Sequence, residues 1–173
     1  MDDAILIRPA LPADAAAMLA IYAPVVLDTA ISFEETPPTR EEFEARVRKV
    51  SDRWAWLVAE RGGRVIGYAY GSQHRERAAY RFSTETTAYI AADARGQGVG
   101  RRLYEALFPV LASRGYCQAF AGVALPNPGS VALHRAVGFE PIGVFPKVGW
   151  KFGRWHDVAW FSRGLRESPD GAG

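Results

Sequence analysis

Residues 95–100 read Arg-Gly-Gln-Gly-Val-Gly, a run whose residue types and spacing suit the binding of a phosphate group. The run follows the β-branched stretch 86–91 and opens the helical pattern of 101–113. A strand, a glycine turn and a helix N-terminus together present converging backbone N–H groups, and glycine leaves no Cβ in the way. Because Arg95 and Arg101 add positive charge, the sequence predicts a site for a phosphate-bearing ligand.

Two common phosphate loops do not fit this run. A P-loop needs Lys-Ser or Lys-Thr directly after its last glycine, and neither pair follows here. A dinucleotide-binding loop needs a third glycine, but Arg101 stands there when the count starts at Gly96. When the count starts at Gly98, Leu103 stands there. The remaining pattern is Arg-x-x-Gly-x-Gly, and a glycine-rich turn without a ligand is its plain alternative.

The composition is that of a soluble globular protein: 173 residues, of which 49% are hydrophobic and 23% charged. The formal net charge of +2 is too small to indicate binding to nucleic acid. The single cysteine, Cys117, cannot form an intrachain disulfide, and no apolar run approaches the ~20 residues that span a bilayer. Because no basic and apolar leader follows Met1, we expect a cytoplasmic protein.

Hydrophobic periodicity predicts a chain of mixed α and β structure. We expect a single domain, 1–166, and a flexible polar tail, 167–173. Hairpin turns are predicted at 61–63 and 149–153. The predicted strands are 4–8, 54–60, 64–72, 81–91, 117–124, 139–148 and 154–164, and the later helices are 101–113 and 130–137.

Two earlier helices are indicated by residues that can cap a helix N-terminus. Asp14 can cap a helix whose apolar face includes Ala17. Thr39 and Glu42 have the spacing of a capping box, and they open a second helix with Phe43 facing inward.

Four more segments resemble one enzyme family when they are taken together with the glycine loop. They are Ser-Phe-Glu-Glu-Thr-Pro at 32–37, and the segments 80–90, 125–134 and 149–158. Their order and residues resemble the phosphinothricin N-acetyltransferase branch of the GCN5-related N-acetyltransferase (GNAT) superfamily. That branch also includes methionine sulfoximine and methionine sulfone acetyltransferases. The resemblance covers nearly all of 4–165.

This resemblance implies a fold of the α/β (α+β) class. The GNAT fold is a central, mixed and mostly antiparallel twisted sheet of about seven strands, splayed between strands 4 and 5 and flanked by about four helices. It also implies acetyl-CoA as co-substrate and a homodimer. The implied acetyl-CoA contacts are Ala88, Tyr89, Ile90, Arg95, Gly96, Gln97, Gly98, Val99, Gly100, Arg101, Asn127 and Ser130. Those on the strand act through backbone groups, which bind the pantetheine amides and the thioester oxygen.

Glu85 is the candidate general base. An alkylammonium with a pKa of roughly 8–10 must lose a proton before it attacks a thioester, and a nearby carboxylate can accept that proton. Glu85 lies in a run of threonines on the strand that leads to the glycine loop. The alternative is a solvated glutamate or an ion-pair partner of Arg81. The resemblance implies the catalytic role.

His134 is the second catalytic candidate. It stands seven residues after Asn127, where many acetyltransferases have a tyrosine that protonates the departing thiolate. Histidine suits proton transfer because its unperturbed pKa is about 6.5. An acid, a second base and a positioner of water all remain open, and the alternative is a core histidine packed near Gly138 and Phe139. Asn127 and Ser130 can bind CoA or cap the short helix.

The other two histidines carry no clear catalytic signal. His74 and His156 lack the spacing of a metal-binding motif, so we expect no metal site. His156 is expected to make a structural hydrogen bond, and Cys117 to lie buried in a strand.

Acceptor contacts are predicted in two places. An amino-acid-like acceptor carries a carboxylate, which a forked arginine donor binds well, so Arg75 and Arg81 are candidates. Phe33 can form a wall of the pocket and Tyr80 can supply a hydroxyl group. Residues 147–150 can approach from a second subunit. Each arginine can equally be a surface charge.

Three functions fit the sequence. The first is acetylation of the α-amine of a small glutamate-like or methionine-like compound. The second is acetylation of a protein N-terminus or a polyamine, although the arginines of 75–81 oppose a polyamine. The third is an acetyl-CoA-binding regulatory module without catalysis. Glu85 and His134 favour an enzyme, but a family fold alone does not establish turnover.

Overall fold

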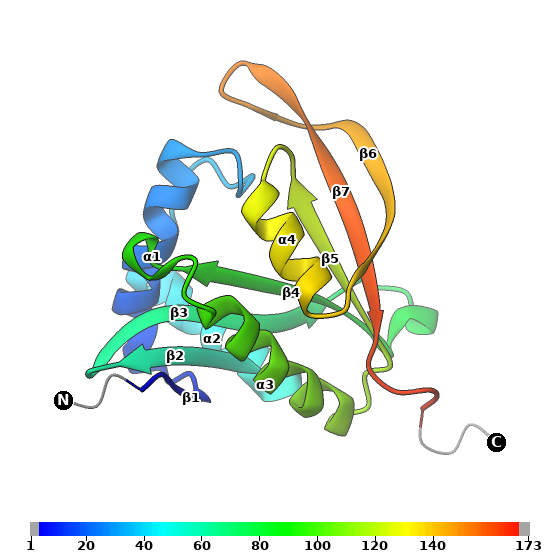
Figure 1. Cartoon of the computed structure of the whole chain (residues 1–173), viewed down its shortest axis with the longest axis horizontal. Coiled ribbons are helices and arrows are strands. Elements are labelled where there is room, and N and C mark those ends of the chain that lie inside the picture. Colours follow the sequence, from blue (N-terminus) through cyan, green and yellow to red (C-terminus); the bar gives the residue numbers. More distant parts are fainter. Residues whose placement is uncertain (1–3, 170–173) are drawn as a thin grey trace.

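The computed structural model describes residues 4–169, and its seven strands form one sheet in the order β1-β2-β3-β4-β5-β7-β6 (Figure 1). Neighbouring strands are antiparallel except for β4 and β5, which are parallel. This confirms the expected GNAT-type sheet. The strands are β1 (Leu6–Pro9), β2 (Trp56–Arg61), β3 (Arg64–Gln73), β4 (Ser83–Ile90), β5 (Gln118–Ala124), β6 (Glu140–Lys151) and β7 (Arg154–Gly164). The α-helices of the described residues are α1 (Ala15–Asp28), α2 (Arg40–Arg53), α3 (Val99–Ser113) and α4 (Pro128–Ala136).

The sheet is splayed between β4 and β5, as expected. Their pairing covers only Ser83–Glu85 against Gln118–Phe120, although β4 continues to Ile90 and β5 to Ala124. Beyond Glu85 the edge of β4 that faces β5 therefore has no strand on it. The helices α3 and α4 flank this opening (Figure 1).

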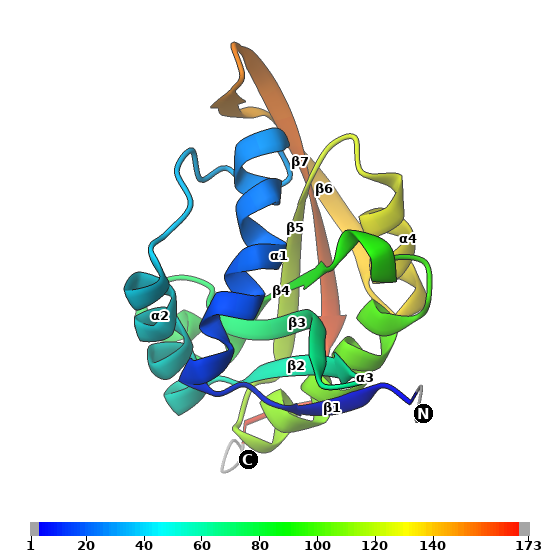
Figure 2. The same cartoon turned by 90° about the vertical axis from the view of Figure 1, so that its left-hand side faces the viewer.

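The two faces of the sheet are covered by different helices (Figure 2). On one face α3 buries Leu103, Leu107 and Leu111, which recur at helical spacing and are 0% exposed. On the other face α1 and α2 bury a separate cluster that includes Met18 and Phe43. The two hydrophobic clusters fix β3 and β4 from both sides, which gives the splayed strand a rigid base.

The helix-capping predictions had different outcomes. The capping box of α2 is confirmed, with Glu42 N donating to Thr39 Oγ1 at 3.2 Å and Thr39 N to Glu42 Oε2 at 2.8 Å. The capping of α1 by Asp14 was wrong, because a 3-10 turn, Pro12–Asp14, precedes the helix and Asp14 is already helical. Its carboxylate instead accepts from Leu11 N and pairs with Arg8, both at 2.8 Å.

Several predicted boundaries shift by a few residues. Ala17, expected on the apolar face of α1, is exposed. The first strand is Leu6–Pro9 rather than 4–8, because Pro9 lies on an edge strand that tolerates the missing N–H. The 61–63 turn is confirmed. The last turn is narrower than 149–153, since positive φ angles occur at Phe152 and Gly153 and β6 extends to Lys151. Part of the predicted tail, 170–173, lies outside the described residues.

Candidate active site

A cavity of about 390 Å³ opens where β4 and β5 diverge. Its walls come from β4, from the glycine loop with the first turn of α3, and from α4, and Val25 of α1 and Ile31 complete them. The structure thus gathers around one cavity almost all residues predicted to contact acetyl-CoA. The predicted residues that line it are Ala88, Tyr89, Ile90, Arg95, Gly96, Gly98, Val99, Gly100, Arg101, Asn127, Ser130 and His134.

Gln97 is the exception among the predicted contacts. It does not line the cavity, because it stands between two glycines with positive φ and its side chain turns to the outside of the loop. Its amide nitrogen donates to the carbonyl oxygen of Asp93 at 2.9 Å, and its oxygen accepts from Arg61 at 2.8 Å. Gln97 therefore braces the loop against the β2–β3 turn.

The N-terminus of α3 leaves its backbone donors available to a ligand. Gly98, at the N-cap, has φ +78°, a left-handed conformation that favours glycine, and no side chain caps the helix. Gly100 allows α3 and α4 to pack closely, because a Cβ there would lie 2.8 Å from a methyl group of Leu133 on α4 and that side chain would have to shift. Uncapped N–H groups at a positive helix end form a site for an anion such as a phosphate.

Glu85 lies at the last position at which β4 pairs with β5, and a histidine contacts its side chain. Its Oε1 is 3.1 Å from Nδ1 of His74, and its side chain is 28% exposed. The His74 ring stacks on Phe120, with ring centres 4.6 Å apart, and meets the Tyr80 ring edge-on at 5.7 Å. Arg81, the alternative partner of Glu85, instead donates to the carbonyl oxygen of Ala78 at 3.0 Å.

The sequence reasoning missed this role of His74. The signal that would have found it is the register of the β3–β4 hairpin, in which Ser72 lies opposite Glu85. His74 follows two residues later, directly after the end of β3. Without a predicted register, the residue separation alone does not place the two side chains together.

His134 lies at the wall of the cavity and inside an aromatic cluster. The residue is only 5% exposed, and its ring packs against Phe139 and Phe161, with ring centres 5.2 and 5.7 Å away. Nδ1 is 2.7 Å from the carbonyl oxygen of Ser130, and Nε2 is 3.1 Å from the Tyr104 hydroxyl. Because a carbonyl only accepts, Nδ1 carries the proton and Nε2 accepts from Tyr104.

Burial governs the ionisation of this group. It lowers the pKa of His134 because the charged imidazolium is disfavoured, and the Ser130 carbonyl offsets only part of this effect. Burial also raises the pKa of Tyr104, so that hydroxyl stays protonated. His134 is therefore a neutral ring whose two nitrogens are both hydrogen-bonded. It packs against core aromatic residues, and it also lines the cavity.

Asn127 caps the N-terminus of α4. Its side-chain oxygen accepts from Ser130 N at 3.1 Å, as one of the two predicted uses required. The Ser130 hydroxyl lies 3.3 Å from Nδ1 of His134. The same short helix thus orients the histidine and presents polar groups to the cavity.

The predicted acceptor contacts fall into two separate places. Arg75, Tyr80 and Arg81 surround a depression of about 270 Å³ beyond the end of β3. Phe33 lies apart from them, on the loop after α1, where its ring touches Gly149 of the β6–β7 hairpin. The structure therefore brings together three of the four residues.

A buried lysine that the sequence reasoning did not single out fixes the position of the Phe33 loop. Lys151 is 4% exposed, and its Nζ donates to the carbonyl oxygens of Val26, Ser32 and Glu34 at 2.6, 2.8 and 2.8 Å. Burial lowers its pKa, and the charges of Glu35 and Glu34 oppose that effect. The lysine joins the end of α1 and the following loop to the hairpin.

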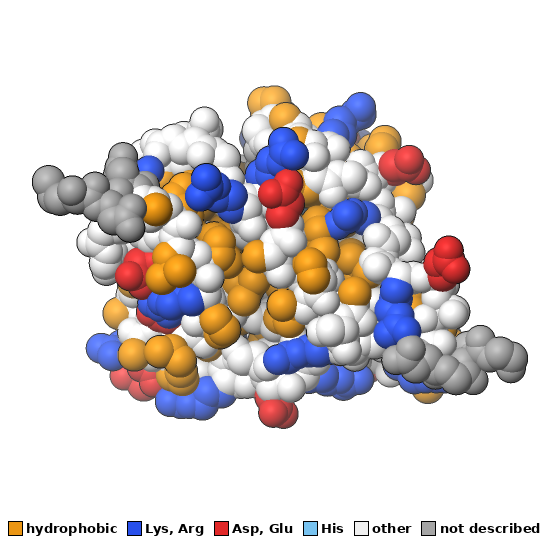
Figure 3. All heavy atoms as spheres, turned by 60° about the horizontal axis from the view of Figure 1, so that its bottom comes forward, with side chains coloured by type: hydrophobic (Ala, Val, Ile, Leu, Met, Phe, Trp, Pro, Cys, Tyr) orange, Lys and Arg blue, Asp and Glu red, His pale blue; other side chains and the backbone are white. Residues whose placement is uncertain are grey.

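The surface carries charges of both signs, and the described residues hold neither a metal-binding cluster nor a membrane-spanning helix. Figure 3 shows Lys and Arg side chains interspersed with Asp and Glu on the face toward the lower side of Figure 1, around an area of hydrophobic side chains. Among residues 4–169 no three His, Cys, Asp or Glu side chains are placed to hold a metal ion. Within the same residues, none of the helices has the length and apolar character needed to traverse a bilayer.

Comparisons with known proteins place the chain among acetyltransferases. The model of the Acetyltransferase (GNAT) domain matches residues 7–160. A phosphinothricin N-acetyltransferase of Alcaligenes faecalis is 46% identical over 154 residues, covering 88% of this chain and 78% of that protein. An L-methionine sulfoximine/L-methionine sulfone acetyltransferase of Pseudomonas paraeruginosa is 37% identical, with 92% and 94% covered. A GNAT superfamily phosphinothricin acetyltransferase from Sinorhizobium meliloti, solved in complex with AcCoA, has a TM-score of 0.92 at 37% identity, with 97% and 94% covered.

Proposed function

The chain belongs to the GNAT acetyltransferase family, and from this premise we propose that it acetylates a small amino-acid-like acceptor with acetyl-CoA. The acceptor is of the phosphinothricin, methionine sulfoximine or methionine sulfone type, which are the compounds that the relatives' names specify. The observation that carries the proposal is the cavity at the splay, which joins an uncapped helix N-terminus to the open edge of β4.

The residues of this cavity fit acetyl-CoA. The N-terminus of α3 and Arg95 and Arg101 suit the pyrophosphate, because backbone donors and cations converge there. The pantetheine amides would pair with β4 at Ala88–Ile90, as an added strand does, since β5 has diverged from this stretch. The bound co-substrate supplies the acetyl thioester.

Glu85 acts as the general base in this proposal. Its carboxylate takes a proton from the acceptor ammonium, directly or through a water, and the free amine attacks the thioester carbonyl. The new C–N bond forms as the C–S bond breaks, giving an N-acetyl product, CoA and one released proton. A backbone N–H of β4 stabilises the charge on the carbonyl oxygen. His74 holds the Glu85 side chain in position.

His134 is proposed to be a positioning residue. Both ring nitrogens are taken by Ser130 and Tyr104, and the lowered pKa leaves little imidazolium at neutral pH. These contacts support the orientation of α4 and its cavity-facing groups more than direct proton transfer to the thiolate.

The acceptor's α-carboxylate is proposed to bind Arg75 and Arg81. Both arginines are exposed and line one depression with Tyr80, whose ring contacts the histidine that holds Glu85. A forked guanidinium in this depression would hold the α-carboxylate while the α-amine reaches Glu85. Phe33 would close the opposite side of the acceptor site from its loop.

We also propose a homodimer formed through the β6–β7 hairpin. The hairpin projects beyond the rest of the molecule (Figure 1), and β6 is an edge strand. Trp150 and Trp155 are 56% and 54% exposed. Such an exposed apolar surface is typical of an interface. The other large exposed side chains there are Ile142, Val144, Phe145, Val148 and Phe152.

Charge introduced into that surface should separate the subunits. Because a buried, unpaired carboxylate is costly, Trp150→Glu is expected to raise the dimer dissociation constant at least about tenfold. Sedimentation equilibrium measures this directly, and the exposed Leu27→Glu on α1 is the matched control. A wild-type chain that sediments as a monomer at micromolar concentration would contradict the dimer.

The function is tested by following CoA thiol release from acetyl-CoA with a panel of amines. The panel holds phosphinothricin, methionine sulfoximine, methionine sulfone, glutamate, spermidine and a short peptide, with products identified by mass. Turnover confined to the small amino acids supports the proposal. Turnover only on the peptide or spermidine favours the second function, and acetyl-CoA binding without turnover on any amine favours a regulatory module.

A further inference from the structure

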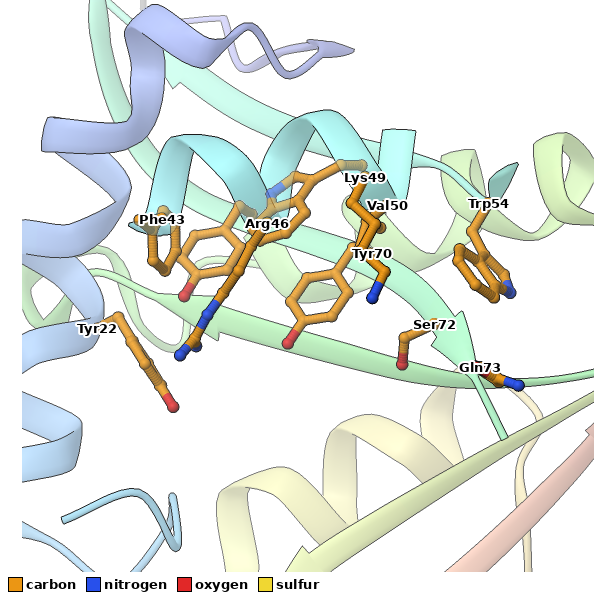
Figure 4. Close-up of a pocket in the computed structure, with 11 residues that line it drawn as sticks. Tyr22, Phe43, Arg46, Lys49, Val50, Trp54, Tyr70, Ser72 and Gln73 are labelled. Carbon is orange, nitrogen blue, oxygen red and sulfur yellow. The ribbon is translucent and has the colours of Figure 1, made fainter. Parts of the chain in front are cut away.

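A second cavity, of about 280 Å³, lies beneath α2, on the face of the sheet that α1 and α2 cover (Figure 4). Its floor is aromatic, and two cations, Arg46 and Lys49, extend over it from successive turns of α2. The polar ends of Tyr22, Arg46, Lys49, Tyr70 and Ser72 point to the same side of the cavity (Figure 4). The two cavities share no lining residue, and they adjoin where the Tyr22 ring of the second lies 5.0 Å, centre to centre, from the Tyr89 ring of the first.

This second cavity ends beside the proposed general base. In the β3–β4 hairpin, Ser72 lies directly opposite Glu85, and Tyr70 lies opposite Thr87. Side chains at opposite positions of an antiparallel pair share a face, with Cβ atoms about 5 Å apart. Since Ser72 lines the cavity, Glu85 is the direct cross-strand neighbour of a lining residue.

The cavity also adjoins the depression at the end of β3. Trp54 and Gln73 line both hollows. An α-amino acid with its amine at Glu85 therefore has an arginine-lined depression on one side and the cationic cavity on the other. In the proposed acceptors, a side chain of a few bonds separates the α-carboxylate from the distal group.

Of the two cations that line this cavity, only Arg46 has an ion-pair partner among the described residues. Arg46 forms a forked ion pair with Glu34, with its two terminal nitrogens 2.6 and 3.4 Å from the carboxylate oxygens. Lys49 has neither an ion-pair nor a hydrogen-bond partner within residues 4–169. Burial raises the pKa of Tyr70 to about 12, so its hydroxyl remains a donor. The cavity thus combines an unpaired cation, hydroxyl donors and a cation already holding an internal carboxylate.

We propose that this cavity is the subsite for a distal oxyanion of the acceptor, such as a phosphinate, bound by Lys49 and Arg46. This inference rests on the proposed function and adds the charge class of the acceptor. Glu34 is the internal competitor, whose carboxylate holds Arg46 until the acceptor's oxyanion displaces it. The enzyme therefore prefers an anionic distal group to a neutral sulfone.

The decisive variant is Lys49→Met, which removes the unpaired cation and keeps the aliphatic length. Its matched control is Arg48→Met, which removes one charge from the same helix at a residue that pairs with Glu44 and does not line the cavity. For phosphinothricin, Lys49→Met should lower kcat/KM about 10- to 100-fold, the worth of one charge-assisted hydrogen bond. For methionine sulfone, the change should stay within about twofold, and Arg48→Met should change neither.

Glu34→Gln tests the competitor with the opposite sign. Because it frees Arg46 from a carboxylate, it should lower KM for phosphinothricin several-fold and leave KM for methionine sulfone unchanged. Equal losses for both acceptors in Lys49→Met, or no loss, would overturn the subsite while leaving the acetyltransferase function intact. An absence of turnover in the wild type would overturn the function instead. Calorimetric binding of phosphinothricin to wild type and Lys49→Met then still decides the subsite, since equal affinities reject it.

Discussion

The cavity at the N-terminus of α3 and the cavity beneath α2 differ in the chemical groups that they present. The first is built mainly from the segment from β4 to α3, with α4 as a further wall, and it offers backbone N–H groups and glycines. The second is assembled from α1, α2 and β3, and it offers side chains: two cations, tyrosine hydroxyls and a serine. Backbone donors hold a constant group such as a pyrophosphate, whereas side chains can change with the acceptor. Glu85 lies on β4, opposite Ser72 of the second cavity and three residues before Ala88 of the first.

The largest expected effect on activity comes from a change at Glu85. Replacing Glu85 by Gln removes the proton acceptor while keeping the hydrogen-bonding shape, and kcat should fall about 10²- to 10⁴-fold. KM for acetyl-CoA should stay within about twofold, because Glu85 does not line that cavity. Steady-state kinetics with both substrates measure this. A kcat that is unchanged in Glu85→Gln would remove the residue from the chemistry.

The next effect concerns the acceptor side and the stability of its loop. In Lys151→Met the carbonyls of Val26, Ser32 and Glu34 lose their shared donor, and the free energy of unfolding should fall by about 2–4 kcal/mol. KM for the acceptor should rise because the Phe33 loop loses its anchor, and KM for acetyl-CoA should not change. Urea unfolding and kinetics check both. Lys147→Met, at an exposed lysine of the same strand, is the control, and an equal loss there would contradict the anchoring role.

A change in the glycine loop should affect the binding of acetyl-CoA rather than that of the acceptor. Gly98→Ala places a Cβ at φ +78°, which costs roughly 1–2 kcal/mol and misaligns the donors of α3. KM for acetyl-CoA should rise about tenfold, with KM for the acceptor unchanged. Gly115→Ala, also at positive φ but at the far end of α3, should lower stability without moving either KM. Equal shifts in the two variants would show that the loop's conformation is unimportant for binding.

The smallest effect is a pH dependence from His134. Its pKa is lower in the folded chain than the unfolded value of about 6.5, so the unfolded chain binds more protons between those two pKa values. The stability contributed by the neutral ring is present above pH ~6.5 and is lost as the pH falls through the folded pKa. Urea unfolding at pH 7.5 and 5.5 should therefore show a smaller pH difference in His134→Gln than in wild type. An unchanged difference would mean that this ring titrates normally.

The sequence predicted the glycine-loop end of the molecule far better than the acceptor end. Residues 86–101 form a strand, loop and helix start that are contiguous, so local rules placed their groups together. His74, by contrast, meets Glu85 only because of the β3–β4 register. Arg46 and Lys49 read as ordinary charges on the polar face of a helix until α2 is packed on the sheet. The side chain of Gln97 does not line the cavity, because sequence adjacency does not give the direction of a loop side chain.

Kinetics with both substrates in one pair of variants test most directly whether the two cavities bind different substrates. For Gly98→Ala and Lys49→Met, KM for acetyl-CoA and kcat/KM for phosphinothricin at saturating acetyl-CoA are determined side by side. We expect Gly98→Ala to change only the acetyl-CoA value and Lys49→Met to change only the phosphinothricin value. A Lys49→Met enzyme that loses affinity for acetyl-CoA, or a Gly98→Ala enzyme that loses only acceptor efficiency, would contradict the division of the site into these two ends.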